Sequence, residues 1–322
     1  MSNQNLFERV TGGNEDIPAD WMPATKVRPF VFEDPSIIWL EYHGKIYGFE
    51  PDKSPYDFLD FISEKAKQFE NKWTEMITPE AIRICKEIYD VRSPDKVKET
   101  IEYLKDGVPV LAQPALWWSK ERIYGVPDFI VHSSWLRGKF PKLVIDSGST
   151  SLLNDTAISG YYLILDLKFT TKLDESAKLK DFLNYSAQVR IYSYMLGQIQ
   201  GYMPSKAFLI ARDRIFDPLE IDIKSKLEQP LDEDLAKIRN KFIDIKKNGA
   251  KYLPWKDEIV LSNLANDDER WMTAKNIMAN EKFPGRDPLL LHQIGPGLKQ
   301  ELNNNGFSIF QFCPFKSLIC IM

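Results

Sequence analysis

The sequence predicts an α/β fold, in which a mixed central sheet is flanked by helices and followed by a small helical C-terminal module. Three observations carry this prediction: a strand pattern over 161–170, a helical pattern over 178–201 and a second strand pattern over 206–211. Side chains alternate across a strand and repeat every three to four residues along a helix, so the two patterns are distinguishable.

The bulk composition is that of a globular protein. The 322 residues suffice for one large domain or two, and 43% hydrophobic with 27% charged residues is an ordinary balance. A net charge of −4 does not favour a nucleic-acid binder, but clustered basic groups or a bound metal would still permit one. Three cysteines suit a reducing compartment, and neither a signal peptide nor a membrane-spanning run is recognisable. We therefore expect a soluble intracellular protein, cytoplasmic or associated with the nucleoid or nucleus, with no membrane partner.

The first half of the chain predicts short elements. Residues 1–30 are polar and contain several prolines, which indicates a loop or arm. Thr78-Pro79-Glu80 and Ser93-Pro94-Asp95 each resemble a helix start, with a capping residue before a proline. The other expected elements are short strands at 37–40 and 45–47, an amphipathic helix over 56–73 and a helix over 96–104.

The second half predicts the core. Strand patterns cover 108–118, 121–124 and 126–132, and the polar stretch 138–160 resembles a surface insertion before the strand over 161–170. A charged helix is expected over 231–247, and helical character resumes near 267. The resulting division is an N-terminal arm with short strands over 1–54, a core over 55–265 and a helical module over 266–322.

Two charged residues interrupt the apolar strand over 161–170. Alternation places Leu163, Leu165 and Leu167 on one face, and Asp166 and Lys168 on the other. Burying these two charges without partners would be costly, whereas a metal ion would stabilise the aspartate and a phosphate or water would face the ammonium. An ion pair at a water-facing strand end is the plainer alternative. The strand therefore indicates chemistry only in combination with other residues.

Asp128 supplies that combination, because it follows Gly125 at the start of a strand expected to neighbour Asp166. Two carboxylates with a backbone carbonyl, such as that of Leu167, form a hard-oxygen site suited to Mg²⁺ or Mn²⁺. Such a metal lowers the pKa of a bound water and stabilises charge on a phosphate. Lys168 would orient the water or neutralise the developing charge.

Three motifs occur in an informative order: G-x-x-D at 125–128, D-x-K at 166–168 and Q-x-x-x-Y at 188–192. Together they resemble the signature elements of RecB-type nucleases of the PD-(D/E)xK superfamily, and the resemblance covers about 56–211. It implies a restriction-endonuclease-like core. It further implies metal ligands at Asp128, Asp166 and the Leu167 carbonyl, a catalytic Lys168, supporting or DNA-contacting roles for Gln188 and Tyr192, and a metal or supporting role for Glu70.

The function implied by the resemblance is metal-dependent hydrolysis of DNA in repair, recombination or replication, with an exonuclease preferred over an endonuclease. Its cofactor would be Mg²⁺ or Mn²⁺. Its partners would be single- or double-stranded DNA and a helicase or other replication or repair proteins. Two alternatives stay open: a catalytically silent DNA-binding or scaffolding protein with the same fold, and a nuclease acting on RNA.

The C-terminal region carries a second resemblance. Residues 287–312 are similar to a helix-hairpin-helix DNA-binding module, in which Gly295 and Gly297 would approach phosphate and Lys299 would add charge. An ordinary helix cap and turn is the alternative. Some related nucleases hold an iron–sulfur cluster with four cysteines, but this chain has only Cys85, Cys313 and Cys320. We therefore do not expect a cluster.

Overall fold

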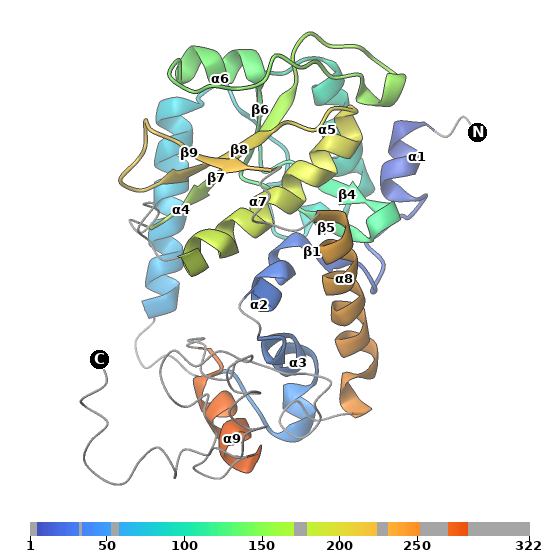
Figure 1. The fold of residues 1–322 in the computed structure, drawn as a ribbon, viewed down its shortest axis with the longest axis vertical. Helices are drawn as coiled ribbons and strands as arrows, with labels where there is room; N and C mark the ends of the chain where they lie inside the picture. The colour runs from blue at the N-terminus through green and yellow to red at the C-terminus, as the bar shows by residue number, and fades with distance from the viewer. Residues whose placement is uncertain are drawn as a thin grey trace. The chain divides into compact units, whose positions relative to one another are not determined.

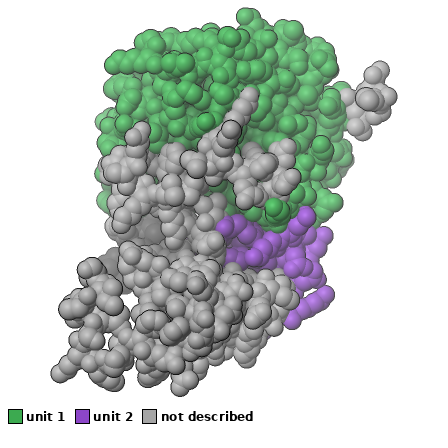
Figure 2. Space-filling view, in the orientation of Figure 1, with its two compact units in different colours: residues 1–28, 58–239 green, residues 29–57, 240–322 purple. Residues whose placement is uncertain are grey.

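The computed structural model contains two compact units (Figure 2). One comprises residues 1–28 and 58–239, and the other comprises residues 29–57 and 240–322. The three-part division expected from the sequence, with boundaries after 54 and 265, stays a prediction. The structure describes residues 5–31, 34–52, 58–170, 179–223, 231–251 and 270–282.

The larger unit is built around a six-stranded sheet in the order β2-β3-β6-β7-β8-β9. Figure 1 labels its strands β6 to β9. Strand β7 is antiparallel to β6 and parallel to β8, so the sheet is mixed. The parallel connection from β7 to β8 runs through the long helix α7, as parallel neighbours require a crossover. The predicted mixed α/β architecture is confirmed. The strands of this sheet and the crossover helix have the bounds β2 Ile82–Arg83, β3 Val110–Ala112, β6 Phe129–His132, β7 Tyr162–Lys168, α7 Leu179–Gln200, β8 Lys206–Ala211 and β9 Leu219–Asp222.

The two faces of β7 have different surroundings. Leu163, Leu165 and Leu167 belong to a buried apolar cluster that includes Trp73 of helix α4, Phe58–Ile77. Asp166 is 1% exposed and lies on the other face, where its charge raises the pKa of Tyr192 of α7. The alternation expected for this strand is therefore present.

A second sheet, in the order β1-β5-β4, accounts for one wrong prediction. Residues 108–118 were expected to form one strand, but they form β3 and then β4, Leu116–Trp118, in different sheets. The chain turns at Gln113, whose φ of 51° is left-handed, and Pro114 then removes a ladder donor. Strand β5, Ile123–Gly125, pairs with β4 and with β1, Met22–Pro23.

The strands predicted at 37–40 and 45–47 are wrong. These residues lie in helix α3, Ser36–His43, and in the 3-10 turn η2, Gly44–Tyr47. In the unit that contains them, Trp39 donates to the carbonyl of Gly249 over 2.7 Å, and the His43 ring contacts the Ile245 carbonyl at 2.8 Å. A short apolar run that is buried all round has no period that distinguishes a helix from a strand.

The helix start predicted at Thr78 is also wrong, because Thr78 follows the end of α4. Its hydroxyl donates to the carbonyl of Thr74 over 3.2 Å, and Pro79 disfavours helical continuation. The predicted helices at 56–73, 96–104 and 231–247 are confirmed with shifted ends. The loop or arm expected over 1–30 is wrong, because this segment contains a helix and a sheet strand and buries Trp21 and Met22. These helices are α4, α5 Pro94–Lys105, α8 Leu231–Asn248 and α1 Leu6–Thr11; the remaining elements are η1 Ala24–Val27, α2 Arg28–Val31, η3 Asp90–Arg92, η4 Ser119–Glu121, α6 Ser133–Lys139, η5 Leu152–Asn154, η6 Gly249–Lys251 and α9 Met272–Lys282.

The long connection between β6 and β7 is only partly the surface insertion expected at 138–160. It begins with α6 and then packs against the end of α7. Ser151 N–H donates to the carbonyl of Gln200 over 2.9 Å, the Thr150 hydroxyl donates to the same carbonyl, and Leu152 is fully buried. In the part of the chain that the structure describes, no helix is long and apolar enough to cross a bilayer.

Candidate active site

Asp128 and Asp166 lie opposite each other where β6 begins beside β7. Phe129 pairs with Leu165, so the next position along each antiparallel strand sets Asp128 against Asp166. The backbone N–H of Leu167 donates to Oδ2 of Asp128 over 2.7 Å and holds this carboxylate against β7. The structure thus brings together the two acids that the sequence predicted to meet.

The two carboxylates interact electrostatically. Burial raises the pKa of Asp128 well above its usual value, and the negative charge of Asp166 raises it further, while Lys168 and the Leu167 N–H act in the opposite direction. Like charges repel strongly where little water screens them. A cation placed between these groups would relieve that repulsion.

Lys168 supplies a fixed positive charge. Its Nζ forms an ion pair with Oδ2 of Asp166, and the two side chains are 16% and 2% exposed. Burial lowers the pKa of Lys168, but Asp166 and Asp128 outweigh this effect, so the pKa is raised overall. The side chain is therefore an ammonium at neutral pH and cannot serve as a proton acceptor. Nζ also lies 5.5 Å from the ring centre of Tyr185, which the Arg28 guanidinium approaches equally closely.

Gln188 and Tyr192 form one buried unit on α7, because the Gln188 amide donates to the Tyr192 hydroxyl over 2.9 Å. Burial raises the pKa of Tyr192, and the charge of Asp166 adds to this effect. Gly125 allows this packing, since a Cβ there would stand 2.5 Å from Cε1 of Tyr192. The glycine of G-x-x-D and the tyrosine of Q-x-x-x-Y are therefore in direct contact.

Glu70 of α4 reaches the acids through Gln113. The Gln113 amide nitrogen donates to Glu70 over 2.9 Å and to Oδ1 of Asp128 over 3.1 Å. The Gln113 backbone N–H also donates to the Asp128 carbonyl over 2.8 Å, and Arg83 approaches Glu70 at 3.4 Å. Glu70 is thus one side chain removed from Asp128.

Sequence reasoning missed Gln113, Tyr185 and Arg28. Tyr185 stands three residues before Gln188, a spacing that puts both on one side of a helix, so this spacing could have revealed it. Neither Gln113 nor Arg28 belongs to a recognisable pattern, because each reaches the site through tertiary structure.

The donors suit a hard divalent cation but do not form a complete cage. Within the described ranges, the His, Cys, Asp and Glu side chains make no group of three or more that could hold a metal ion. Mg²⁺ is commonly held by one or two carboxylates, with waters and substrate phosphate completing its shell. The acids fit that pattern. The carbonyl and the N–H of Leu167 both point toward β6. If the pairing of β6 and β7 is continued by two residues, Pro127 lies opposite Leu167, and a proline has no N–H that could donate to the Leu167 carbonyl.

Several predicted residues cannot be placed in this site. Gly295, Gly297 and Lys299 lie outside the described residues, as do Cys313 and Cys320. Cys85 is buried, and burial raises the pKa of its thiol to about 12. His132, which was not among the predicted site residues, accepts from the Ser134 N–H and contacts the Ser159 carbonyl, so it caps α6.

Comparison with known proteins adds no family to this geometry. A scan against models of protein families finds no match, and a search of curated proteins finds no significant relative.

Proposed function

We propose that this chain is a metal-dependent DNA nuclease, an exonuclease, with a restriction-endonuclease-like core of the PD-(D/E)xK type. The observation that carries the proposal is the convergence of Asp128, Asp166 and Lys168 at one end of β7. The proposal gains support from the contact of Gly125 with Tyr192, which joins two of the three sequence motifs in space.

Asp128 and Asp166 would hold Mg²⁺ or Mn²⁺, with the Leu167 carbonyl as a further ligand. When bound, such a metal supplies Lewis acidity toward phosphate oxygens and an acidified water. The Leu167 N–H fixes the orientation of Asp128, and Gln113 holds its other oxygen, so this carboxylate is preorganised. Preorganised groups need no reorientation during the reaction.

Lys168 would place its ammonium beside the scissile phosphate. It is held by the Asp166 carboxylate and by the Tyr185 face, and its raised pKa keeps it charged. A fixed positive charge stabilises the negative charge that builds on phosphate oxygens during hydrolysis. Tyr192 would support this arrangement through its packing against Gly125, and Gln188 through its hydrogen bond to Tyr192.

The test is the cation requirement of the purified full chain. We expect degradation of linear DNA in Mg²⁺ or Mn²⁺, none in EDTA, and little cutting of covalently closed circular DNA because an exonuclease needs an end. Degradation would be measured as the release of acid-soluble label from the DNA. Cleavage that persists in EDTA would contradict the metal site, cutting of closed circles would contradict the exonuclease, and preference for RNA would contradict the DNA substrate.

Substitution Lys168→Met should lower the single-turnover cleavage rate by roughly 10²-fold, as expected for loss of one charged group that stabilises the transition state. Mn²⁺ affinity, measured by calorimetry, should not fall, because Asp166 loses a competing cation. Lys98→Met, at a side chain 59% exposed on α5, is the matched control. An unchanged rate, or lost Mn²⁺ binding in a folded Lys168→Met variant, would refute this role.

A further inference from the structure

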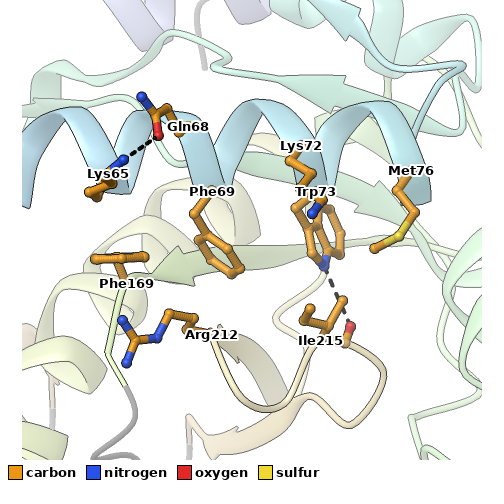
Figure 3. Close-up of a pocket in the computed structure, with 9 residues that line it drawn as sticks. All are labelled: Lys65, Gln68, Phe69, Lys72, Trp73, Met76, Phe169, Arg212 and Ile215. Atoms are coloured by element: carbon orange, nitrogen blue, oxygen red, sulfur yellow. Dashed lines mark hydrogen bonds between the residues drawn. The ribbon is translucent and has the colours of Figure 1, made fainter.

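A pocket of about 320 Å³ lies between α4 and the chain that follows β7 and β8 (Figure 3). Its volume is at the lower end of the range for small-ligand sites, which suits one nucleotide. One wall comes from α4, and the other comes from Phe169 and the connection between β8 and β9. Its lining includes Lys65, Phe69, Lys72, Phe169 and Arg212.

The pocket combines aromatic surfaces with positive charge. The ring centres of Phe69 and Phe169 are 5.9 Å apart, and the Arg212 guanidinium lies over Phe169 at 4.9 Å. Lys65 and Lys72 add two more cations, and none of the described residues that line the pocket is acidic. Aromatic faces stack on nucleobases, and basic groups bind phosphate, so this lining is complementary to a nucleotide.

The pocket is tied by the backbone to the strand end that carries the acids. Thr170 N–H donates to the Lys168 carbonyl over 2.8 Å, and Arg212 N–H donates to the Thr170 carbonyl over 3.1 Å. Phe169 follows Lys168 directly, and strand alternation turns its side chain toward α4, away from Asp166. A polynucleotide crossing this strand end would meet the acids and the pocket at neighbouring positions.

We propose that this pocket binds one nucleotide of single-stranded DNA, with its base against Phe169 and its phosphate against Arg212. The choice of DNA rests on the nuclease function proposed above. A base in a duplex is stacked and paired, so it is not available to a pocket without being extruded. The pocket therefore selects an unpaired nucleotide that flanks the scissile phosphate.

The test measures binding without catalysis. Fluorescein-labelled oligothymidylate of about 12 nucleotides, within the usual range of single-strand site sizes, is titrated with the full chain in EDTA and followed by anisotropy. Phe169→Ala should weaken binding roughly tenfold through lost stacking. Arg212→Ala should also weaken binding and make the log–log salt slope shallower by about 0.7, the value for one single-strand phosphate contact.

Controls separate the pocket from general effects. Tyr89→Ala removes an aromatic side chain 77% exposed elsewhere, and Lys98→Ala removes an exposed charge. Both should bind as the wild type does. If Phe169→Ala does not fold, as judged by circular dichroism, Arg212→Ala decides, because its side chain is exposed.

Several results would overturn the inference. These are equal affinity of the pocket variants and their controls, equal binding of a duplex, and tighter binding of oligouridylate. Because no metal is present, loss of binding in the pocket variants would support the pocket even if the wild type cuts no DNA. Conversely, if the wild type cuts DNA and the pocket variants bind as tightly as it does, the proposed nuclease function stands and the proposed nucleotide pocket is refuted.

Discussion

Replacing Asp166 by asparagine is expected to lower the rate of DNA hydrolysis in Mg²⁺ by at least about 10³-fold. The substitution removes one of two carboxylates proposed to hold the metal, and Lewis-acid stabilisation of a phosphate is worth several kcal/mol. Asp128 remains, but a single carboxylate leaves the cation with less neutralising charge. The apparent Mg²⁺ requirement should rise together with the loss of rate.

The measurement is single-turnover cleavage of end-labelled DNA over a Mg²⁺ titration, with folding checked by circular dichroism. Glu102→Gln on α5, at a side chain 62% exposed, changes charge by the same amount away from the site. It should cut at the wild-type rate. If Asp166→Asn cuts as fast as Glu102→Gln does, the assignment of the site to Asp128 and Asp166 is wrong.

Gly125→Ala is expected to lower the free energy of unfolding by about 1–3 kcal/mol, the range for an extra methyl group in a packed core. The new Cβ would lie 2.5 Å from Cε1 of Tyr192 and 3.1 Å from Cβ of Ala24. Tyr192 is 1% exposed and hydrogen-bonded to Gln188, so its ring cannot turn away freely. The strain must therefore move α7, β5 or both.

Urea denaturation measures this change, and Gly138→Ala is the matched control. A Cβ at Gly138 meets nothing within 4 Å and lies in helix α6, so alanine there should stabilise by about 0.5–1 kcal/mol. In the double variant with Tyr192→Leu, the cost of Gly125→Ala should shrink, which isolates the contact. Identical denaturation midpoints and slopes for wild type and Gly125→Ala would show that Gly125 and Tyr192 are not in contact.

The parts of the fold that the sequence predicted are those with a clear period. β7 is a long apolar run in which the charged residues Asp166 and Lys168 are spaced by two, as in a strand, and α7 is long enough for its helical repeat to stand out. The run at 37–40 has no period because its residues are buried on all sides, so an apolar strand and an apolar helix look alike. The break at Gln113 was missed although Pro114, which cannot donate to a sheet, marks it in the sequence.

The residues of the candidate site fall into the same two groups, those with a signal in the sequence and those without one. Asp128, Asp166 and Lys168 were predicted because their motifs occur in order along the chain, and the register of β6 and β7 then sets the acids opposite each other. Gln113 carries no such signal, since its amide joins Glu70 and Asp128 only after α4 and β3 have packed. Residues that act through the fold leave little trace in a single sequence.

The backbone from Gly125 to Asp128 passes from the three-stranded sheet into the six-stranded one within a few residues. Gly125, where this crossing begins, is held by the small sheet. In that sheet Trp117 of β4 packs edge-on against Trp21, with their ring centres 5.6 Å apart. The position of Asp128 therefore depends on both sheets. Damage to the indole pair would be transmitted to Asp128 along this short crossing.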